Sequence, residues 1–472
     1  MIKTSAILLF LNYCLGKKVD MSMVVAKIDW RQLYTFASRQ AILGFCFDGI
    51  ERLAKEFSEE LKQNPMGRDL LMTWMGKAQQ IRRQNMKVNA VAGKLFSMLR
   101  EDGLRCCILK GQGNALMYPN PYSRTPGDID VWINASRERI MEYASKKFEL
   151  GDDIRLQHLE TSLDGVPVEL HFFPCSMNNP IYHARLQKWF KRNADLQCSN
   201  VVSLPDGAGD IAIPTSAFNV VYQLTHLYHH FFDEGIGMRQ IIDYFLVVND
   251  FSKNVFLDTD LSNHPVNFSN HPVPLSKEGS TFSPSPSSSG SGDVTAPSRC
   301  SEPLRSKDGG PSKVSPDCAG WDRLDAIGAS KPSPGCAGWD RLDTTGDTSS
   351  VSCSSASTAL DVVQRELKYL GLWKFAGAVM YVLKEVLGLS EDKMIVPVDE
   401  KRGKLLLAEI LNGGNFGRHF TKYGGFTHQI MGKKFFLKIW RNMHFVRYYP
   451  AEALSEPIFR TWHFFWRMKN KK

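Results

Sequence analysis

A long segment of low complexity divides the 472-residue chain into two parts. Residues 261–360 contain 23 Ser, 11 Pro and 10 Gly, together 44 of 100 positions. That share exceeds the roughly 25–30% at which low complexity is the default interpretation. Such a composition buries too little apolar surface to offset an ordering cost of roughly 1–2 kcal/mol per residue. We therefore expect a disordered insert over 252–360. An eight-residue sequence that occurs twice within it, at 318–325 and 336–343, is interpreted as a duplication without a role in the chemistry.

The sequence pattern differs between the regions on either side of the insert. Residues 1–99, 206–251 and 361–472 are predicted to be helical, because their apolar residues recur at spacings of three and four. Residues 100–205 contain short apolar runs separated by turn residues, which indicates an α+β unit. We expect an N-terminal helical region, an α+β core, and one helical domain whose two parts meet in space across the insert.

Composition places the chain in the class of globular proteins. Apolar residues make up 43% and charged residues 23%, which are ordinary proportions for that class. No apolar run reaches the ~18 residues that a membrane-spanning helix needs. The ten cysteines include no Cys-x-x-Cys pair, and the apolar residues 6–11 are not followed by a cleavage site for export. We therefore expect a cytoplasmic protein whose first helix contains residues 6–11.

The positive charge is concentrated at the C-terminal end of the sequence. Ten Lys or Arg and two acidic residues lie between Lys433 and Lys472, which accounts for nearly all of the net charge of +9. Eleven aromatic residues are interleaved with these cations, among them Trp440, Trp462, Phe464, Phe465 and Trp466. The favoured interpretation is a helix that buries its aromatic residues and leaves Lys and Arg in water. The alternative is a surface that binds nucleic acid or an anionic layer.

Two aspartates, Asp128 and Asp130, alternate with apolar residues on a predicted strand. A spacing of two places both side chains on one face of the strand. Burying two like charges together is costly without a counter-ion. Mg²⁺ supplies one, because it binds one or two carboxylates together with phosphate oxygens. Glu169, on the next predicted strand, offers a third carboxylate. Three carboxylates from two strands suit a two-metal site for phosphoryl chemistry.

Cationic residues and a glycine lie near these carboxylates in the sequence. Lys110 and Gly111 directly follow an apolar run. A glycine there lets backbone N–H groups approach a phosphate. With Arg124, they form a candidate binding site for a polyphosphate. An ordinary turn is the alternative interpretation of the glycine.

The chain resembles the uncharacterised nucleotidyltransferase family common in gut Bacteroidetes. The resemblance rests on Leu109-Lys-Gly111, Arg124, Gly127-Asp-Ile-Asp-Val-Trp132, Val166-Pro-Val-Glu-Leu-His171, His226, Gly235-Ile-Gly-Met-Arg239, Asp243, Leu370-Gly-Leu-Trp-Lys-Phe375 and Gly414-Asn-Phe-Gly417. The family belongs to the polymerase-beta-like nucleotidyltransferase superfamily. The resemblance therefore implies a mixed sheet in the core at 100–205, and transfer of a nucleoside monophosphate from an NTP to an acceptor.

The resemblance also implies roles for individual residues. Asp128, Asp130 and Glu169 become the catalytic carboxylates and the ligands of two Mg²⁺ ions, while Lys110, Gly111 and Arg124 become nucleotide contacts. The chain departs from the wider superfamily where Lys110-Gly111 replaces a Gly-Ser or Gly-Gly pair, with 16 residues between Gly111 and Asp128. The acceptor is a small molecule, a sugar or a protein, and neither it nor the choice of NTP can be predicted from the sequence.

Histidines on two segments are further candidates. His226, His229 and His230 lie on a predicted helix. Either one of them faces the active site and contacts the substrate, with His226 as the candidate, or they pack within the helical domain. Zinc binding is the least favoured interpretation, because no Cys or carboxylate lies at ligand spacing. His158 and His171 flank Glu169 in the sequence, and either is expected to donate a hydrogen bond to it.

Arg239 is a second candidate for substrate binding. It lies four residues before Asp243 on a predicted helix, so the alternative is that these two side chains pair with each other.

Two other functions remain open from the sequence. One keeps the fold and transfers phosphocholine or a similar group to surface glycans. The other is a non-catalytic protein that senses nucleotides in the cleft or binds nucleic acid through the basic C-terminal segment. Because no recognisable RNA-binding module is present, nucleotidyl transfer to tRNA or poly(A) is less favoured.

Overall fold

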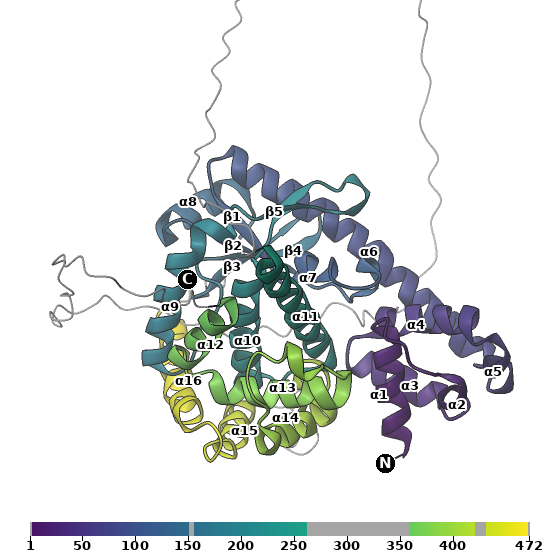
Figure 1. Cartoon of the computed structure of the whole chain (residues 1–472). Helices are drawn as coiled ribbons and strands as arrows, with labels where there is room; N and C mark the ends of the chain where they lie inside the picture. The colour runs from purple at the N-terminus through teal and green to yellow at the C-terminus, as the bar shows by residue number, and fades with distance from the viewer. Residues whose placement is uncertain (1, 151–154, 262–357, 421–430, 471–472) are drawn as a thin grey trace, which may run out of the picture. The chain divides into compact units, whose positions relative to one another are not determined.

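The computed structural model describes residues 2–150, 155–261, 358–420 and 431–470, which form helices and two small sheets (Figure 1). Most of the predicted insert, residues 262–357, lies outside the described residues. Its predicted start at residue 252 is wrong, because helix α11 (Met238–Leu261) continues through residues 252–261. The α+β fold class predicted from the sequence is confirmed, because a mixed sheet accompanies a predominantly helical chain.

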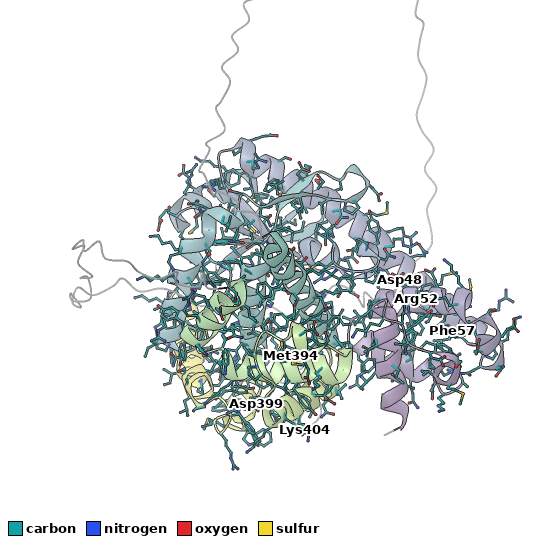
Figure 2. All side chains as sticks on the ribbon, in the orientation of Figure 1. Asp48, Arg52, Phe57, Met394, Asp399 and Lys404 are labelled. Carbon is teal, nitrogen blue, oxygen red and sulfur yellow. The ribbon has the colours of Figure 1, made fainter. Side chains whose placement is uncertain are left out.

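The N-terminal part is helical, as its apolar spacing predicts. Its helices are α1 (Ile2–Cys14), α2 (Ser22–Val25), α3 (Trp30–Arg39), α4 (Leu43–Glu56), α5 (Ser58–Gln63) and α6 (Arg68–Glu101). Helix α1 packs against α4 and α13 (Trp373–Leu387), with Phe10 and Leu11 fully buried. The Arg52 guanidinium, labelled in Figure 2, lies 3.5 Å from the ring centroid of Tyr13. Residues 6–11 therefore belong to the first helix of this packed region, as expected.

The main sheet has four strands in the order β1-β2-β4-β3. Strands β2 and β4 pair in parallel, and the pairs β1–β2 and β3–β4 are antiparallel. The strands are β1 (Cys106–Leu109), β2 (Ile129–Ile133), β3 (His158–Leu163) and β4 (Val166–His171). Apolar side chains between the carboxylates, such as Ile129, Val131 and Leu170, are buried in the core beneath the sheet. The same alternation leaves the acidic side chains on the opposite face.

A two-residue turn fixes how β3 pairs with β4. Asp164 and Gly165 both have positive φ, 51° and 71°, as a type I′ hairpin turn requires. Glu160 therefore lies opposite Glu169, and His158 lies opposite His171. The turn alone sets this register, because a two-residue loop allows no slip between the strands.

The remaining elements surround the sheet and complete the helical region (Figure 1). They are α7 (Gly111–Ala115), η1 (Pro121–Ser123), α8 (Arg137–Lys147), α9 (Pro180–Gln197), β5 (Val201–Ser203), η2 (Pro205–Gly207), β6 (Asp210–Ala212), α10 (Ser216–Asp233), α11 (Met238–Leu261), α12 (Ala359–Tyr369), η3 (Glu391–Lys393), α14 (Glu400–Gly413) and η4 (Asn415–Gly417). Helices α10 and α12 lie against each other although the insert separates them in sequence. Asp399, labelled in Figure 2, caps α14 by accepting a hydrogen bond from the backbone N–H of Arg402.

The C-terminal helices α15 (Met431–Met443) and α16 (Pro450–Asn470) correct one interpretation of the sequence. Four of the aromatic residues expected to be buried are 41–62% exposed: Trp440, Trp462, Phe464 and Phe465. Conversely, Lys438 and Arg441, expected in water, are buried. Searching the described helices for a segment both long and apolar enough to cross a lipid bilayer finds none.

Candidate active site

Carboxylates from three neighbouring strands form a row on one face of the main sheet. Asp130 on β2 is the register partner of Glu169 on β4, and Glu169 is the partner of Glu160 on β3. Register partners point to the same side of a sheet. Asp128 lies immediately before β2. The predicted carboxylates Asp130 and Glu169 are thus brought side by side.

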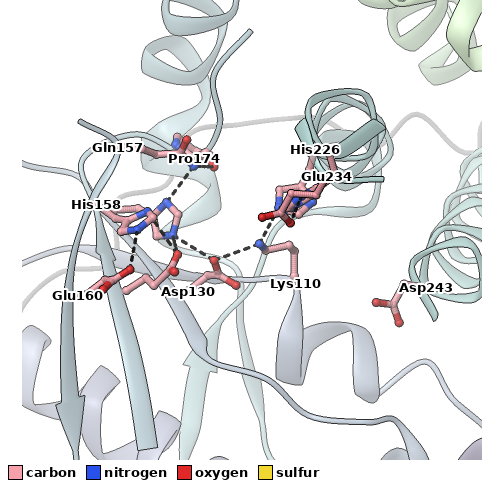
Figure 3. Close-up of polar contacts among 12 residues, drawn as sticks. Lys110, Asp130, Gln157, His158, Glu160, Pro174, His226, Glu234 and Asp243 are labelled. Atoms are coloured by element: carbon pink, nitrogen blue, oxygen red, sulfur yellow. Dashed lines mark hydrogen bonds and ion pairs between the residues drawn. The ribbon is translucent and has the colours of Figure 1, made fainter. Parts of the chain in front are cut away.

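Lys110 supplies a positive charge to this row. Its Nζ lies 3.0 Å from Asp130 Oδ1 and 2.8 Å from His226 Nε2 (Figure 3). Its backbone has φ 52° and ψ −129°, a conformation that costs about 1–3 kcal/mol in a residue with a Cβ and that is typical of functional sites. Gly111, with φ 39°, continues this tight turn and begins α7. The structure therefore places Lys110 at the carboxylates.

His171 joins the two central carboxylates. Its Nε2 lies 3.0 Å from Asp130 Oδ1 and 3.1 Å from Glu169 Oε2. The expected hydrogen bond from this histidine to Glu169 is therefore present. Burial alone lowers the pKa of His171, but its hydrogen bonds to Asp130 and Glu169 outweigh burial and raise that pKa to about 9. At neutral pH His171 is thus an imidazolium that bridges two carboxylates.

The two aspartates differ in their electrostatic environment. Burial alone would raise the pKa of Asp130, but the Lys110 ammonium and His171 outweigh it and hold that pKa well below its ordinary value. Burial raises the pKa of Asp128 to about 7, and the negative charges of Asp130 and Glu169 add to this effect. Asp130 is therefore charged at neutral pH, whereas Asp128 is partly protonated.

His158 lies beside Glu169 with unused ring nitrogens. The residue is buried, and neither ring nitrogen has a hydrogen-bond partner. Nδ1 is 3.3 Å from Glu169 Oε2 and Nε2 is 4.0 Å from Glu160 Oε1. Burial lowers the pKa of His158 to about 4, so the ring is neutral at pH 7. A neutral imidazole with an unpaired nitrogen is a typical metal ligand.

These side chains fit a divalent cation. Ligand atoms of His158, Glu169 and His171 all lie within 4.8 Å of one another, and Asp130 Oδ1 is 3.0 Å from His171. Two ligands of one ion bound at about 2.0–2.1 Å lie about 3 Å apart. This group shares only Glu169 with the predicted set of Asp128, Asp130 and Glu169. His158 adds a neutral nitrogen donor, whereas His171 would ligate a cation only after losing its proton.

Arg124 binds Asp243, which corrects the alternative that Arg239 pairs with Asp243. Arg124 Nε and Nη2 donate to the two carboxylate oxygens of Asp243 at 2.9 and 2.8 Å. Tyr118 donates to the same carboxylate at 2.7 Å. All three side chains are buried. Asp243 therefore fixes the guanidinium of Arg124, and the pair leaves no net charge.

Arg239 adds a buried positive charge beside this pair. Its Nη1 donates to the backbone oxygen of Thr125 at 3.3 Å, and its Nε has no hydrogen-bond partner. Burial and the neighbouring Arg124 charge lower the pKa of Arg239. A phosphate would supply both the missing acceptor and the missing negative charge.

The three histidines of α10 differ in the groups that they contact. His226 contacts Lys110, and its Nε2 is 3.1 Å from Nε2 of His230. Burial lowers the pKa of His226 well below its ordinary value, and burial lowers that of His229 to about 4. Within the described part of the chain, the only His/Cys/Asp/Glu group with metal-ligand spacing is that of His158, Glu169 and His171. His226 is therefore the α10 histidine that contacts Lys110, and its role in substrate binding stays a prediction.

Sequence reasoning missed Glu160 and Tyr118. The signal for Glu160 was available, because the Asp164-Gly165 turn by itself places Glu160 opposite Glu169. For Tyr118 no local signal exists, since its partner Asp243 is 125 residues away.

Comparison with known proteins identifies the family. Residues 26–262, about half of the chain, match the family described as uncharacterised nucleotidyltransferase. The chain belongs to this family. The match contains the carboxylates, Lys110, Arg124 and the helices that carry His226, Arg239 and Asp243, so the family resemblance read from the sequence is confirmed.

Other comparisons add little. No curated protein matches the chain. A similar solved structure is an antigenic nucleotidyltransferase-like protein from Paracoccidioides brasiliensis, with 15% sequence identity and a TM-score of 0.23. The alignment covers 37% of this chain and 90% of that chain. We draw no conclusion about fold or function from similarity at this level.

Proposed function

We propose that this nucleotidyltransferase-family member transfers a nucleoside monophosphate from an NTP to an acceptor hydroxyl or similar nucleophile. The acceptor forms a bond to the α-phosphorus and loses its proton, the bond between the α- and β-phosphates breaks, and pyrophosphate leaves. The observation that carries the proposal is that Asp130 on β2 and Glu169 on β4 are register partners on parallel strands. Asp128 lies immediately before β2. Buried carboxylates in this number need a counter-ion, and Mg²⁺ with a triphosphate is the counter-ion that phosphoryl transfer uses.

We propose Asp128, Asp130 and Glu169 as the Mg²⁺ ligands, with His158 and His171 beside them. Bound there, the cation would neutralise charge on the triphosphate and polarise the transferred phosphoryl group. The pKa of about 7 of Asp128, raised by burial and by the charges of Asp130 and Glu169, supports this assignment. Loss of the Asp128 proton accompanies cation binding, because the charged carboxylate is the ligand.

Positive side chains would orient the triphosphate. Lys110 and Arg239 are the candidates, because Lys110 lies beside Asp130 and the Nε of Arg239 lacks an acceptor. Arg124 is held by Asp243 through both Nε and Nη2, so its proposed role is to keep a fixed charge near the phosphates. Burial of the site keeps water from the reacting phosphorus, which strengthens each of these interactions.

Labelled nucleotides test the proposal. The purified chain is incubated with each labelled NTP, Mg²⁺ and a cell extract as a source of acceptors. We expect a labelled acceptor with wild type, and a rate reduced by roughly 10²–10³-fold in Asp128→Asn and Asp130→Asn, as for loss of one electrostatic contact to a transition state. Calorimetric titration of Mg²⁺ and NTP reports binding separately from turnover.

Asp164→Asn is the matched control. Asp164 is an exposed carboxylate in the β3–β4 turn, paired with Lys94 at 2.6 Å. Asn tolerates its positive φ, so this variant should label the acceptor at the wild-type rate. Labelling that survives both aspartate variants would contradict the proposal. Labelling from CDP-choline but from no NTP would instead support phosphocholine-type transfer.

A further inference from the structure

Helix α16 turns four of its charged or titratable side chains inward. Glu452 and Glu456 are each 1% exposed and His463 is 3% exposed. Arg460, on the same face, donates to Glu456 and, at 2.7 Å, to Asp233. Spacings of four, four and three place these four residues on one face of the helix. The buried face of α16 is therefore polar, the reverse of an ordinary surface helix.

The end of α10 explains this polarity. The last carbonyls of a helix lack partners within the helix. Arg441 and Asn442 of α15 donate to the backbone oxygens of Phe231 and Phe232, each at 2.8 Å. The Asp233 carboxylate at the same end accepts from Arg460. The two C-terminal helices thus use their polar faces to satisfy the carboxyl end of α10.

Because the inner faces are polar, the apolar side chains point outward. On α16 they recur at spacings of three and four and are 41–74% exposed: Leu454, Ile458, Trp462, Phe465 and Met468. On α15 they are 46–71% exposed: Phe436, Trp440 and Met443. We call these eight residues the C-terminal surface. Monomeric proteins in water rarely expose apolar patches larger than a few hundred Å², so this surface indicates a partner.

Charge defines the chemistry of that partner. Lys433, Arg447 and Lys469 are exposed on or between the two helices. Both acidic residues of α15 and α16, Glu452 and Glu456, are buried. The described side chains that reach solvent here are therefore apolar, cationic or uncharged. A surface of this kind matches a partner that is both apolar and anionic.

We propose that the C-terminal surface docks on an anionic lipid bilayer, with α15 and α16 lying in the plane of the membrane interface. Apolar side chains would enter the boundary of the acyl chains, Trp440 and Trp462 would lie at headgroup level, and the cations would contact anionic headgroups. This use of the helices leaves the proposed nucleotidyl transfer unchanged and does not depend on it.

Two other partners fit less well. Nucleic acid is bound by stacking on aromatic rings, whereas Leu454, Ile458 and Met468 offer aliphatic side chains. A second copy of the chain would bring the same cations face to face across a two-fold interface. A bilayer accepts aliphatic and aromatic side chains alike and supplies the opposite charge.

Vesicle co-sedimentation of the full chain tests the proposal. The probes are vesicles of phosphatidylcholine alone and vesicles of equal parts phosphatidylcholine and phosphatidylglycerol. We expect wild type to sediment with the anionic vesicles and to remain in the supernatant with the neutral ones. Ile458→Gln and Phe465→Gln should each weaken binding roughly tenfold, because each removes one inserted apolar side chain.

Control variants separate binding from folding. Ile458 and Phe465 are 74% and 62% exposed, so their replacement should leave the melting temperature unchanged. Met23→Gln, on α2 and 69% exposed, should sediment like wild type. Equal sedimentation of wild type, Ile458→Gln and Phe465→Gln would overturn the proposal. Absence of binding of the wild type to anionic vesicles would also overturn the proposal. In that case, a dimer in sedimentation velocity would indicate a second copy as the partner, and RNA affinity in filter binding that Ile458→Gln and Phe465→Gln lose would indicate nucleic acid.

Discussion

At the scale of single residues, the site is a balance of buried charges. Asp130 is neutralised by Lys110 and His171, and Asp243 is neutralised by Arg124. Unpaired charges remain at Asp128 and Arg239, whose pKa values both shift toward the neutral form because of burial. In the proposed function, a metal-bound triphosphate would satisfy both groups, since it would bring a cation to Asp128 and an anion to Arg239.

The Arg124–Asp243 pair gives a prediction at this scale. Both side chains are 6% exposed, so Asp243→Asn strands a buried guanidinium beside Arg239. Breaking a buried pair in this way costs about 3–5 kcal/mol, which urea denaturation monitored by circular dichroism would measure. The double replacement Arg124→Met with Asp243→Leu should recover much of the loss. A loss below about 1 kcal/mol in Asp243→Asn would show that solvent reaches the pair.

At the scale of elements, the β5–β6 hairpin and helix α6 are held together by a close approach of their backbones. Gly93 on α6 lies against the backbone of Ala208 and Gly209, in the connection between β5 and β6. A Cβ at position 93 would overlap the Ala208 carbonyl oxygen. The helix and the β5–β6 hairpin can therefore approach this closely only because residue 93 has no side chain.

Two glycines on the same helix give an internally controlled prediction. Gly93→Ala should destabilise the fold by about 1–3 kcal/mol, because the hairpin must shift to admit a methyl group. Gly76→Ala, where a Cβ meets nothing within 4 Å, should stabilise it by about 0.5–1 kcal/mol through reduced chain entropy. Urea denaturation of both variants checks the difference. Equal effects at the two positions would contradict the close packing of α6 on the hairpin.

At the scale of the whole molecule, the C-terminal helices are joined to the core by buried polar contacts. The Glu452 carboxylate accepts hydrogen bonds from the backbone N–H groups of Asn178 at 2.6 Å and Asn179 at 3.2 Å. Asp233 of α10 binds Arg460. The family match ends at residue 262. These contacts therefore connect a region outside the match to the residues just before α9 and, through Asp233, to the helix that carries His226.

Glu452 predicts how stability depends on pH. Burial raises its pKa from 4.5 to about 7. The folded state therefore holds the proton more tightly than the unfolded state. This contribution is fully present below about pH 4.5 and is lost as the pH rises to about 7, by up to about 3 kcal/mol. Glu452→Gln cannot titrate, so its stability relative to wild type should rise across that interval.

Denaturation of both proteins at several pH values measures this difference. Glu400→Gln on α14 is the control, since Glu400 is exposed and the Lys404 side chain beside it lowers its pKa. A constant difference between Glu452→Gln and wild type would contradict the prediction.

The sequence by itself determined the row of carboxylates. Apolar and polar residues alternate over 128–133 and 166–171, so Asp130 and Glu169 lie on the face of their strands opposite the apolar core. The Asp164-Gly165 turn fixes the register that places Glu160 and His158 on β3 opposite β4. These features follow from local geometry, because a strand has a period of two and a two-residue turn allows one alignment. The α+β class of residues 100–205 was predicted from such local patterns, whereas the mixed sheet was implied by the resemblance to the family.

Tertiary structure alone decided which partners distant residues find and which helix faces are buried. Arg124 binds Asp243 across 119 residues, although Arg239 lies only four residues from that aspartate. Helical spacing groups Leu454, Ile458 and Trp462 on one face and Glu452, Glu456 and Arg460 near the other. It does not specify which face turns inward, because that depends on what the neighbouring element offers. Here the neighbour is the carboxyl end of α10, whose carbonyls and Asp233 need donors, so the polar faces of α15 and α16 are buried and the apolar faces are exposed.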